Sequence, residues 1–153
     1  MIIIKLIGST ILAVISSMSF GIITNIPKRA LAPSAITGGI AWMSYYIVAL
    51  LMTGIVFPNV VGGFCVGCLG NFFAKKSKTP ISMIYIGSLI SLVPGGLAFN
   101  SLRLLDGKNT LGMINGVINV VLVAVSLTAG IGIASLVINH IQNIKKTRNK
   151  QRK

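Results

Sequence analysis

The chain has 153 residues, of which 54% are hydrophobic and only 10% are charged. A soluble domain carries about a quarter charged residues, so this composition excludes an ordinary soluble protein and predicts an all-α integral membrane protein. Lys and Arg number 14 against a single acidic residue. Because these cations lie between apolar blocks and in the C-terminal tail, they indicate membrane topology, with the lipid bilayer as partner and no binding of nucleic acid.

The first half of the chain contains two uncharged blocks separated by a charged segment. The first block, from Leu6 to Thr24, is long enough to cross the bilayer. The segment NIPKRALAP at 25–33 predicts a loop, because its prolines and paired charges cannot continue a lipid-exposed helix. The second block, 34–74, would be roughly 60 Å long as one helix, about twice the bilayer core, so it must turn back. Its only proline, in the sequence FPN at 57–59, predicts where it turns.

The second half begins with the basic loop KKSKTP at 75–80 and continues with a span that ends in Pro-Gly-Gly. A mixed polar connection at 100–110 leads to a long final span, and we expect the basic tail KKTRNKQRK to be disordered. The sequence thus predicts a membrane domain at 1–140 and a basic cytoplasmic tail at 141–153. The five predicted spans lie at about 6–24, 35–56, 59–74, 81–99 and 111–138.

Five spans distribute the charges unequally between the two sides of the membrane. One side receives the basic tail and two basic loops, which contain Lys28, Arg29, Lys75, Lys76 and Lys78. The positive-inside rule then predicts an outside N-terminus and a cytoplasmic C-terminus. The start of the chain also resembles a signal peptide, but no A-x-A-like cleavage site follows it, so we expect the first span to be retained.

Few residues are suited to chemistry. Asp106 is the only acidic residue, so the chain has no pair of carboxylates for acid/base catalysis or for a hard cation. His140 is the only histidine, and we interpret it as an interfacial residue rather than a proton relay. Neither residue can form a metal site alone. We therefore expect no enzymatic activity, no metal and no cofactor.

Small residues gather on two of the predicted spans. Cys65 and Cys68 have the spacing of a redox motif, but within an apolar span they belong to a small-residue surface suited to helix packing. On the last span, small and amide side chains recur at helical spacing. This stripe predicts either a packing seam or a polar permeation path, with Asn115 and Asn119 in the path. The predicted packing residues are Gly63, Gly67, Gly112, Gly116 and Gly130.

The fourth predicted span ends in SLVPGGLAFN at 91–100. Proline lacks a backbone N–H and glycine tolerates unusual dihedral angles, so the helix is expected to open here. Broken helices in transporters bind solutes with the exposed backbone groups, although an ordinary helix end at the interface would have the same sequence. The candidate path residues are Ser88, Ser91, Pro94, Gly95, Gly96, Asn100, Asn115 and Asn119.

The chain resembles a known family over nearly its whole length. The sequences SFGIITNIPKRAL and FFAKKSKTPISMIYIGSLISLVPGG, with five spans in this length, are similar to the smaller component of the two-component threonine/serine exporters. That resemblance implies export of threonine, serine or a small carboxylate such as succinate, across the inner membrane of a bacterium. It also implies a larger multi-span partner subunit and coupling to protons. Because no predicted span contains a carboxylate, we place any proton coupling in the partner.

A different class of function remains compatible with the sequence. The chain would then be a structural or assembly subunit that packs its glycine faces against a partner and never contacts solute. A membrane enzyme is a more distant alternative.

Overall fold

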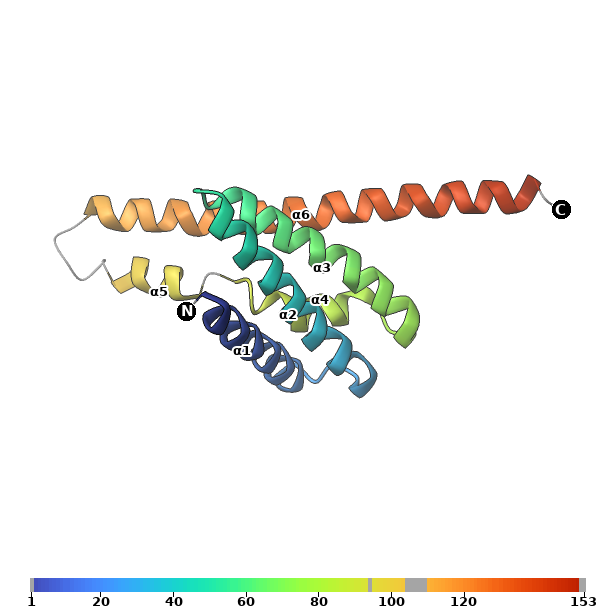
Figure 1. The fold of residues 1–153 in the computed structure, drawn as a ribbon, viewed down its shortest axis with the longest axis horizontal. Coiled ribbons are helices and arrows are strands. Elements are labelled where there is room, and N and C mark those ends of the chain that lie inside the picture. The colour runs from blue at the N-terminus through green and yellow to red at the C-terminus, as the bar shows by residue number, and fades with distance from the viewer. Residues whose placement is uncertain (1, 94, 104–109, 152–153) are drawn as a thin grey trace.

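The computed structural model describes residues 2–93, 95–103 and 110–151, and within these ranges every regular element is an α-helix (Figure 1). This confirms the predicted all-α architecture. The helices follow one another as α1 Ile2–Ile23, α2 Lys28–Leu51, α3 Val56–Ser77, α4 Ile81–Leu89, α5 Gly95–Arg103 and α6 Thr110–Gln151.

Among the described residues, four helices are long and apolar enough to cross a membrane, namely α1, α2, α3 and α6. Their outward faces expose large apolar side chains; Leu12 of α1, for example, is 67% exposed. Such surfaces are stable when lipid covers them. The fourth expected span, 81–99, is present as two short helices, α4 and α5, with a break between them.

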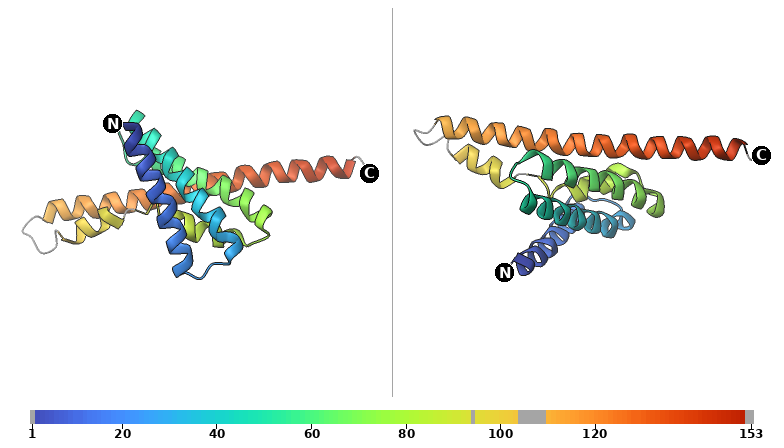
Figure 2. Two further views of the ribbon diagram at one scale, coloured as in Figure 1. Left: turned by 60° about the horizontal axis from the view of Figure 1, so that its bottom comes forward. Right: turned by 45° about the horizontal axis from the view of Figure 1, so that its top comes forward.

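The helices form a bundle against one side of α6. Helix α3 packs against α6 and α2, while α2 also packs against α1 and α4, and α5 packs against the beginning of α6 (Figures 1 and 2). The central core joins Ala41, Val66, Leu92, Val123 and Leu127. Leu92 belongs to the break after α4, so the break is anchored inside the bundle.

A tight corner joins α1 to α2. Asn25 adopts a left-handed conformation with a φ of 57°, and the N–H of Ile26 donates to the carbonyl of Gly21 over 3.1 Å. This is the pattern of a Schellman helix end. Pro27 follows as the N-cap of α2, where its fixed φ suits a helix start.

The corner between α3 and α4 repeats this geometry. Lys78 is left-handed with a φ of 51°, the N–H of Thr79 donates to the carbonyl of Ala74 over 3.2 Å, and Pro80 is the N-cap of α4. Each of these residues lies 53 positions after its counterpart in the first corner, the same separation as that of Gly38 and Ser91.

Residues that contact each other between α2 and α4 are also 53 positions apart in the sequence. Ser34 packs against Gly87, where an added Cβ would lie 2.6 Å from the Ser34 hydroxyl oxygen, and the Ser91 hydroxyl donates to the carbonyl of Gly38 over 3.2 Å. Two equivalent pairs one helical turn apart mean that α2 and α4 run parallel. Both corners therefore lie at the same end of the bundle (Figure 1).

Two connections differ from those that the sequence analysis predicted: the first is shorter and the second lies earlier in the chain. The loop expected at 25–33 is largely helical, because α2 begins at Lys28 and contains Pro33. The turn expected at 57–59 lies instead at 52–55, and Pro58 is the third residue of α3. An N–H at that position has no acceptor within the helix, so proline is tolerated there. Helix α3 consequently has 22 residues instead of the short span 59–74.

The tail expected to be disordered continues α6 as helix to Gln151. Helix α6 has 42 residues and is therefore about 63 Å long, roughly twice the bilayer core. Its membrane-competent part ends at Gln142, close to the expected boundary of the membrane domain. The C-terminal part of α6 extends past the other helices (Figure 2).

Candidate functional site

The break between α4 and α5 is formed by residues 90–93, while Pro94 lies outside the described residues. The carbonyl of Leu89 accepts the N–H of Leu92 at 2.9 Å and that of Val93 at 3.0 Å, which closes the end of α4. Gly95 and Gly96 begin α5, and neither has a positive φ. The sequence analysis expected the helix to open through unusual dihedral angles at these glycines, but both glycines lie in α5 and the break precedes them.

Buried hydroxyl groups lie beside this break, where α1, α2 and α4 meet. Ser17, Ser34 and Ser88, one from each helix, are all 0% exposed. Gly38 permits their close approach, because an added Cβ would overlap Ser17 and lie 3.2 Å from the Ser88 carbonyl oxygen. Ser91 follows Ser88 by one turn, and its hydroxyl has two acceptors within reach, the carbonyls of Gly38 at 3.2 Å and of Ser88 at 3.0 Å.

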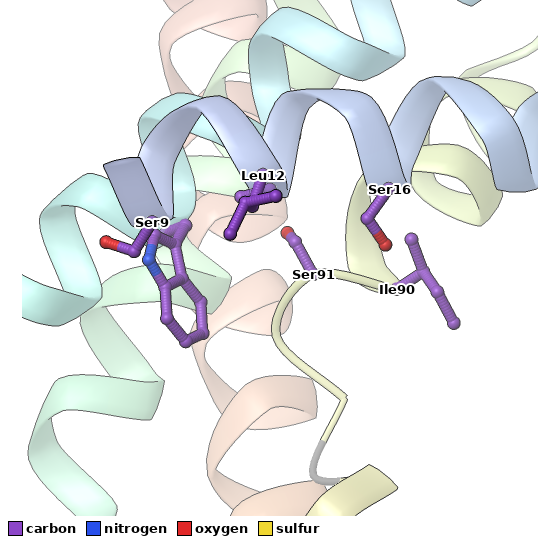
Figure 3. Close-up of a pocket in the computed structure, with 7 residues that line it drawn as sticks. Ser9, Leu12, Ser16, Ile90 and Ser91 are labelled. Atoms are coloured by element: carbon purple, nitrogen blue, oxygen red, sulfur yellow. The ribbon is translucent and has the colours of Figure 1, made fainter. Parts of the chain in front are cut away.

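A first cavity of about 270 Å³ lies between α1 and the break, and it opens to the outer surface of the bundle, where Leu12 and Ser16 of its lining are exposed. Its hydroxyl groups come from Ser9 and Ser16 of α1 and from Ser91, which faces α1 across the cavity (Figure 3). Leu12, Ala13, Ile90 and Trp42 complete the lining. The volume lies slightly below the roughly 300–1,000 Å³ of pockets for drug-sized ligands, so it suits a small solute.

A second cavity of about 280 Å³ lies on the other side of the break, toward α3 and α6. None of the described residues lining either cavity is charged. The second cavity is lined by Trp42, Tyr45, Ile55, Asn59, Leu92, Val93, Gly95, Gly96 and Val123.

Trp42 lines both cavities, and its indole Nε1 is buried without a hydrogen-bond partner among the described residues. An unsatisfied buried donor costs about 1–3 kcal/mol. The ring packs against Tyr45 with its centroid 5.3 Å away and the ring planes tilted by 35°. The sequence analysis did not select Trp42, although it is the only tryptophan in the chain.

The structure gathers some of the predicted path residues and separates others. Ser91 lines the first cavity, Gly95 and Gly96 line the second, and Ser88 is buried beside Ser91. Asn100 is exposed on α5, away from both cavities. Asn115 is exposed and Asn119 is half-buried on α6, and neither lines either cavity.

Asn59 is a polar residue of the second cavity that the sequence analysis missed. Only 3% of it is exposed, and its amide donates to the carbonyl of Ile55 over 2.6 Å. The signal was present in the sequence, since Asn59 is a polar residue in a block without charge. Because Pro58 predicts a turn at 57–59, the sequence places Asn59 in a connection, whereas the structure places it inside α3.

The predicted packing glycines lie largely at contacts within the chain. An added Cβ at Gly63 would overlap the Leu127 carbonyl oxygen, one at Gly67 would overlap Ala134, and one at Gly130 would overlap the Val60 carbonyl oxygen. These positions bring the backbones of α3 and α6 together. Gly116 packs against Ser101 of α5 in the same way, and Gly112 is half-buried nearby on α6.

The cysteines lie on the same helix as two of these glycines. Both are free and partly buried, and the Cys65 thiol donates to the Ser44 hydroxyl over 3.3 Å. Within the described residues no group of three or more His, Cys, Asp or Glu side chains is placed to hold a metal ion.

Comparison with known proteins identifies the family. The model of one family, described as Threonine/Serine exporter, ThrE, matches residues 9–137, which include most of α1, all of α2 to α5 and the greater part of α6. No significant match is found among curated proteins. No solved structure matches either. The family match and the four membrane-competent helices together show a multi-pass membrane protein, and we assign it to the inner membrane of a bacterium. The chain belongs to the threonine/serine exporter family.

Proposed function

We propose that this chain is one subunit of a secondary transporter that exports threonine, serine or a closely related small solute along the break between α4 and α5. The observation that carries the proposal is the break itself, a helix interrupted inside the bundle with a cavity on each side. Interrupted helices offer backbone groups to a solute without exposing them to lipid.

The uncharged lining favours a solute without net charge. A dianion such as succinate would lose its hydration with no cation among the described lining residues to compensate. A zwitterionic hydroxy amino acid carries its own counter-charge, and hydroxyl groups and backbone carbonyls can bind it. We therefore favour threonine and serine over small dicarboxylates.

Proton coupling is assigned to a larger partner subunit. The only acidic residue of the sequence, Asp106, lies outside the described residues. His140, the only histidine, is exposed near the end of the membrane-competent part of α6. A proton carrier within the membrane normally requires a carboxylate or histidine that faces the transport path. We expect the partner to supply it.

We also propose an orientation with the N-terminus outside and the C-terminus in the cytoplasm. The two corners next to Lys28, Arg29, Lys75, Lys76 and Lys78 lie at one end of the bundle, and α6 runs toward that end (Figure 1). The positive-inside rule assigns this end to the cytoplasm.

The structural-subunit alternative is less favoured by the packing. It depended on glycine faces that would contact a partner, but Gly63, Gly67 and Gly130 pack at the contact between α3 and α6 of the same chain. A role in solute transport makes use of the two cavities, whereas a purely structural role does not.

The test is threonine efflux from cells loaded with a threonine dipeptide. We expect no efflux from this chain alone and efflux when it is produced with the proposed larger multi-span subunit, which we expect to be encoded next to it. In that pair, Ser91→Leu fills the first cavity and Gly96→Leu fills the second, and each should abolish efflux at normal membrane abundance. Gly132→Leu is the matched control, because no atom lies within 4 Å of a Cβ added there. Efflux from this chain alone would refute the proposal, as would undiminished efflux from both cavity variants.

A further inference from the structure

Trp42 contributes its side chain to the lining of both cavities. It is the only described residue that lines both of them. The residues of the break divide between the two sides, with Ile90 and Ser91 at the first cavity and Leu92 and Val93 at the second. A solute that followed the break from one cavity to the other would have to pass the indole ring.

The indole N–H is an uncommitted hydrogen-bond donor in this lining. Three of the other donors in the two linings are engaged: the Ser9 hydroxyl donates to the carbonyl of Leu6 over 3.1 Å, Ser91 donates to a backbone carbonyl, and the Asn59 amide donates to Ile55. The Nε1 atom of Trp42 has no partner among the described residues. Buried donors in native structures are nearly always paired, so an unpaired one next to a cavity requires an explanation.

Among the described residues, the uncharged lining offers no cation to the carboxylate of an amino acid solute. A zwitterionic amino acid brings a carboxylate, and no described lining residue is a cation that could neutralise it. Neutral N–H and O–H donors must then bind the carboxylate oxygens, and a hydrogen bond to a charged acceptor is stronger than one between neutral groups. An indole N–H satisfies this need without holding the solute as tightly as a cation would.

We propose that Trp42 separates the two cavities and that its indole N–H donates a hydrogen bond to the carboxylate of the solute as the solute passes between them. This inference rests on the proposed function, since it assumes that an amino acid moves along the break. In the structure the Trp42 side chain borders both cavities, and its ring packs against Tyr45. Rotation of the ring toward either cavity joins the two spaces and brings the N–H to the solute.

Two substitutions separate the roles of the ring and of the N–H. Trp42→Phe keeps an aromatic ring but removes the donor, so we expect the half-saturating threonine concentration for efflux to rise about 10- to 100-fold with the maximal rate largely retained. Trp42→Ala removes the partition, so we expect a leak of amino acids that the intact pair excludes. Tyr46→Phe is the matched control, because Tyr46 lies one turn further along α2 and lines neither cavity.

Fluorescence gives a second readout that does not depend on transport. Trp42 is the only tryptophan in this chain, so the difference in emission between the purified wild-type complex and its Trp42→Phe variant comes from this residue. We expect that difference to change in a saturable manner with threonine and to remain unchanged with threoninol, which lacks the carboxylate.

The outcomes distinguish this inference from the proposed function. If Ser91→Leu and Gly96→Leu abolish efflux while Trp42→Phe and Trp42→Ala both transport like wild type, the role of Trp42 is refuted and the path along the break stands. If the cavity variants transport normally, the proposed function fails. If the emission difference between wild type and Trp42→Phe does not change when threonine is added, the inference about Trp42 is refuted whatever the transport assays show.

Discussion

The hydroxyl of Ser91 donates a hydrogen bond to the carbonyl oxygen of Gly38, joining the break after α4 to the middle of α2. The two residues lie 53 positions apart, the same separation as that between the two corners. This bond, with Leu92 in the central core, holds the break against the helix that carries Trp42. The position of the candidate path therefore follows from how α2 and α4 pack.

Ser91→Ala should weaken this attachment slightly. Hydrogen bonds between membrane helices contribute about 0.6 kcal/mol on average, so we expect a loss of stability of that order. Reversible unfolding by SDS in mixed micelles measures it. Ser19→Ala, an exposed serine on α1, is the control and should change nothing. An equal effect of both substitutions would mean that the contact with Gly38 contributes no stability.

We expect Gly130→Ala and Gly132→Ala, both on α6, to have different effects on the stability of the protein. An added Cβ at Gly130 would overlap the backbone of Val60 and meet the backbone N of Phe64 at 2.8 Å, so α3 and α6 must separate and stability should fall by about 1–3 kcal/mol. At Gly132 nothing lies within 4 Å, so alanine should be neutral or stabilise the helix by up to about 1 kcal/mol. The same unfolding assay compares them, and equal effects would contradict the described contact between α3 and α6.

Replacing both cysteines by alanine should leave efflux by the pair nearly intact. The Cys65 thiol makes one weak hydrogen bond, to Ser44, and both cysteines are free. Efflux and membrane abundance of Cys65→Ala with Cys68→Ala are the measurements. Loss of efflux at normal abundance would indicate a redox role for the CVGC sequence.

The same cysteine-free chain tests the orientation. Lys76→Cys near the end of α3 should react with a membrane-impermeant thiol reagent only from the cytoplasmic side. Thr53→Cys, in the connection between α2 and α3, should react only from outside. Both residues are exposed, so access of the reagent does not depend on unfolding. Labelling of both from one side would rule out the proposed arrangement of spans.

The sequence predicted the helical class and the break, because long apolar blocks and a Pro-Gly-Gly sequence are local features. Of the five spans that it predicted, four correspond to described helices that are long and apolar enough to cross a membrane, and the fourth predicted span is divided into α4 and α5. The connections predicted at 25–33 and 57–59 were misplaced, because proline in an apolar sequence was interpreted as the sign of a loop. Pro27 begins a helix instead, and Pro58 lies in a first turn that does not need its N–H.

The composition of the site depended on contacts that local patterns do not reveal. Asn115 and Asn119 were predicted in the path because they recur on one face of a span, but α6 carries them away from both cavities. Trp42 belongs to the site because α2 and α4 run parallel, which places it beside residues nearly 50 positions later in the chain. The two proline corners, 53 residues apart, were the sequence feature that could have indicated this pairing.

Accessibility of a single cysteine at the break, in the cysteine-free chain produced with its partner, tests the path most directly. We expect a small thiol reagent to block efflux in the Ser91→Cys variant, and threonine to slow that modification in proportion to its occupancy of the site. Gly132→Cys, treated identically, should continue to transport. If Ser91→Cys is fully modified and efflux continues at the untreated rate, the solute does not pass the break between α4 and α5.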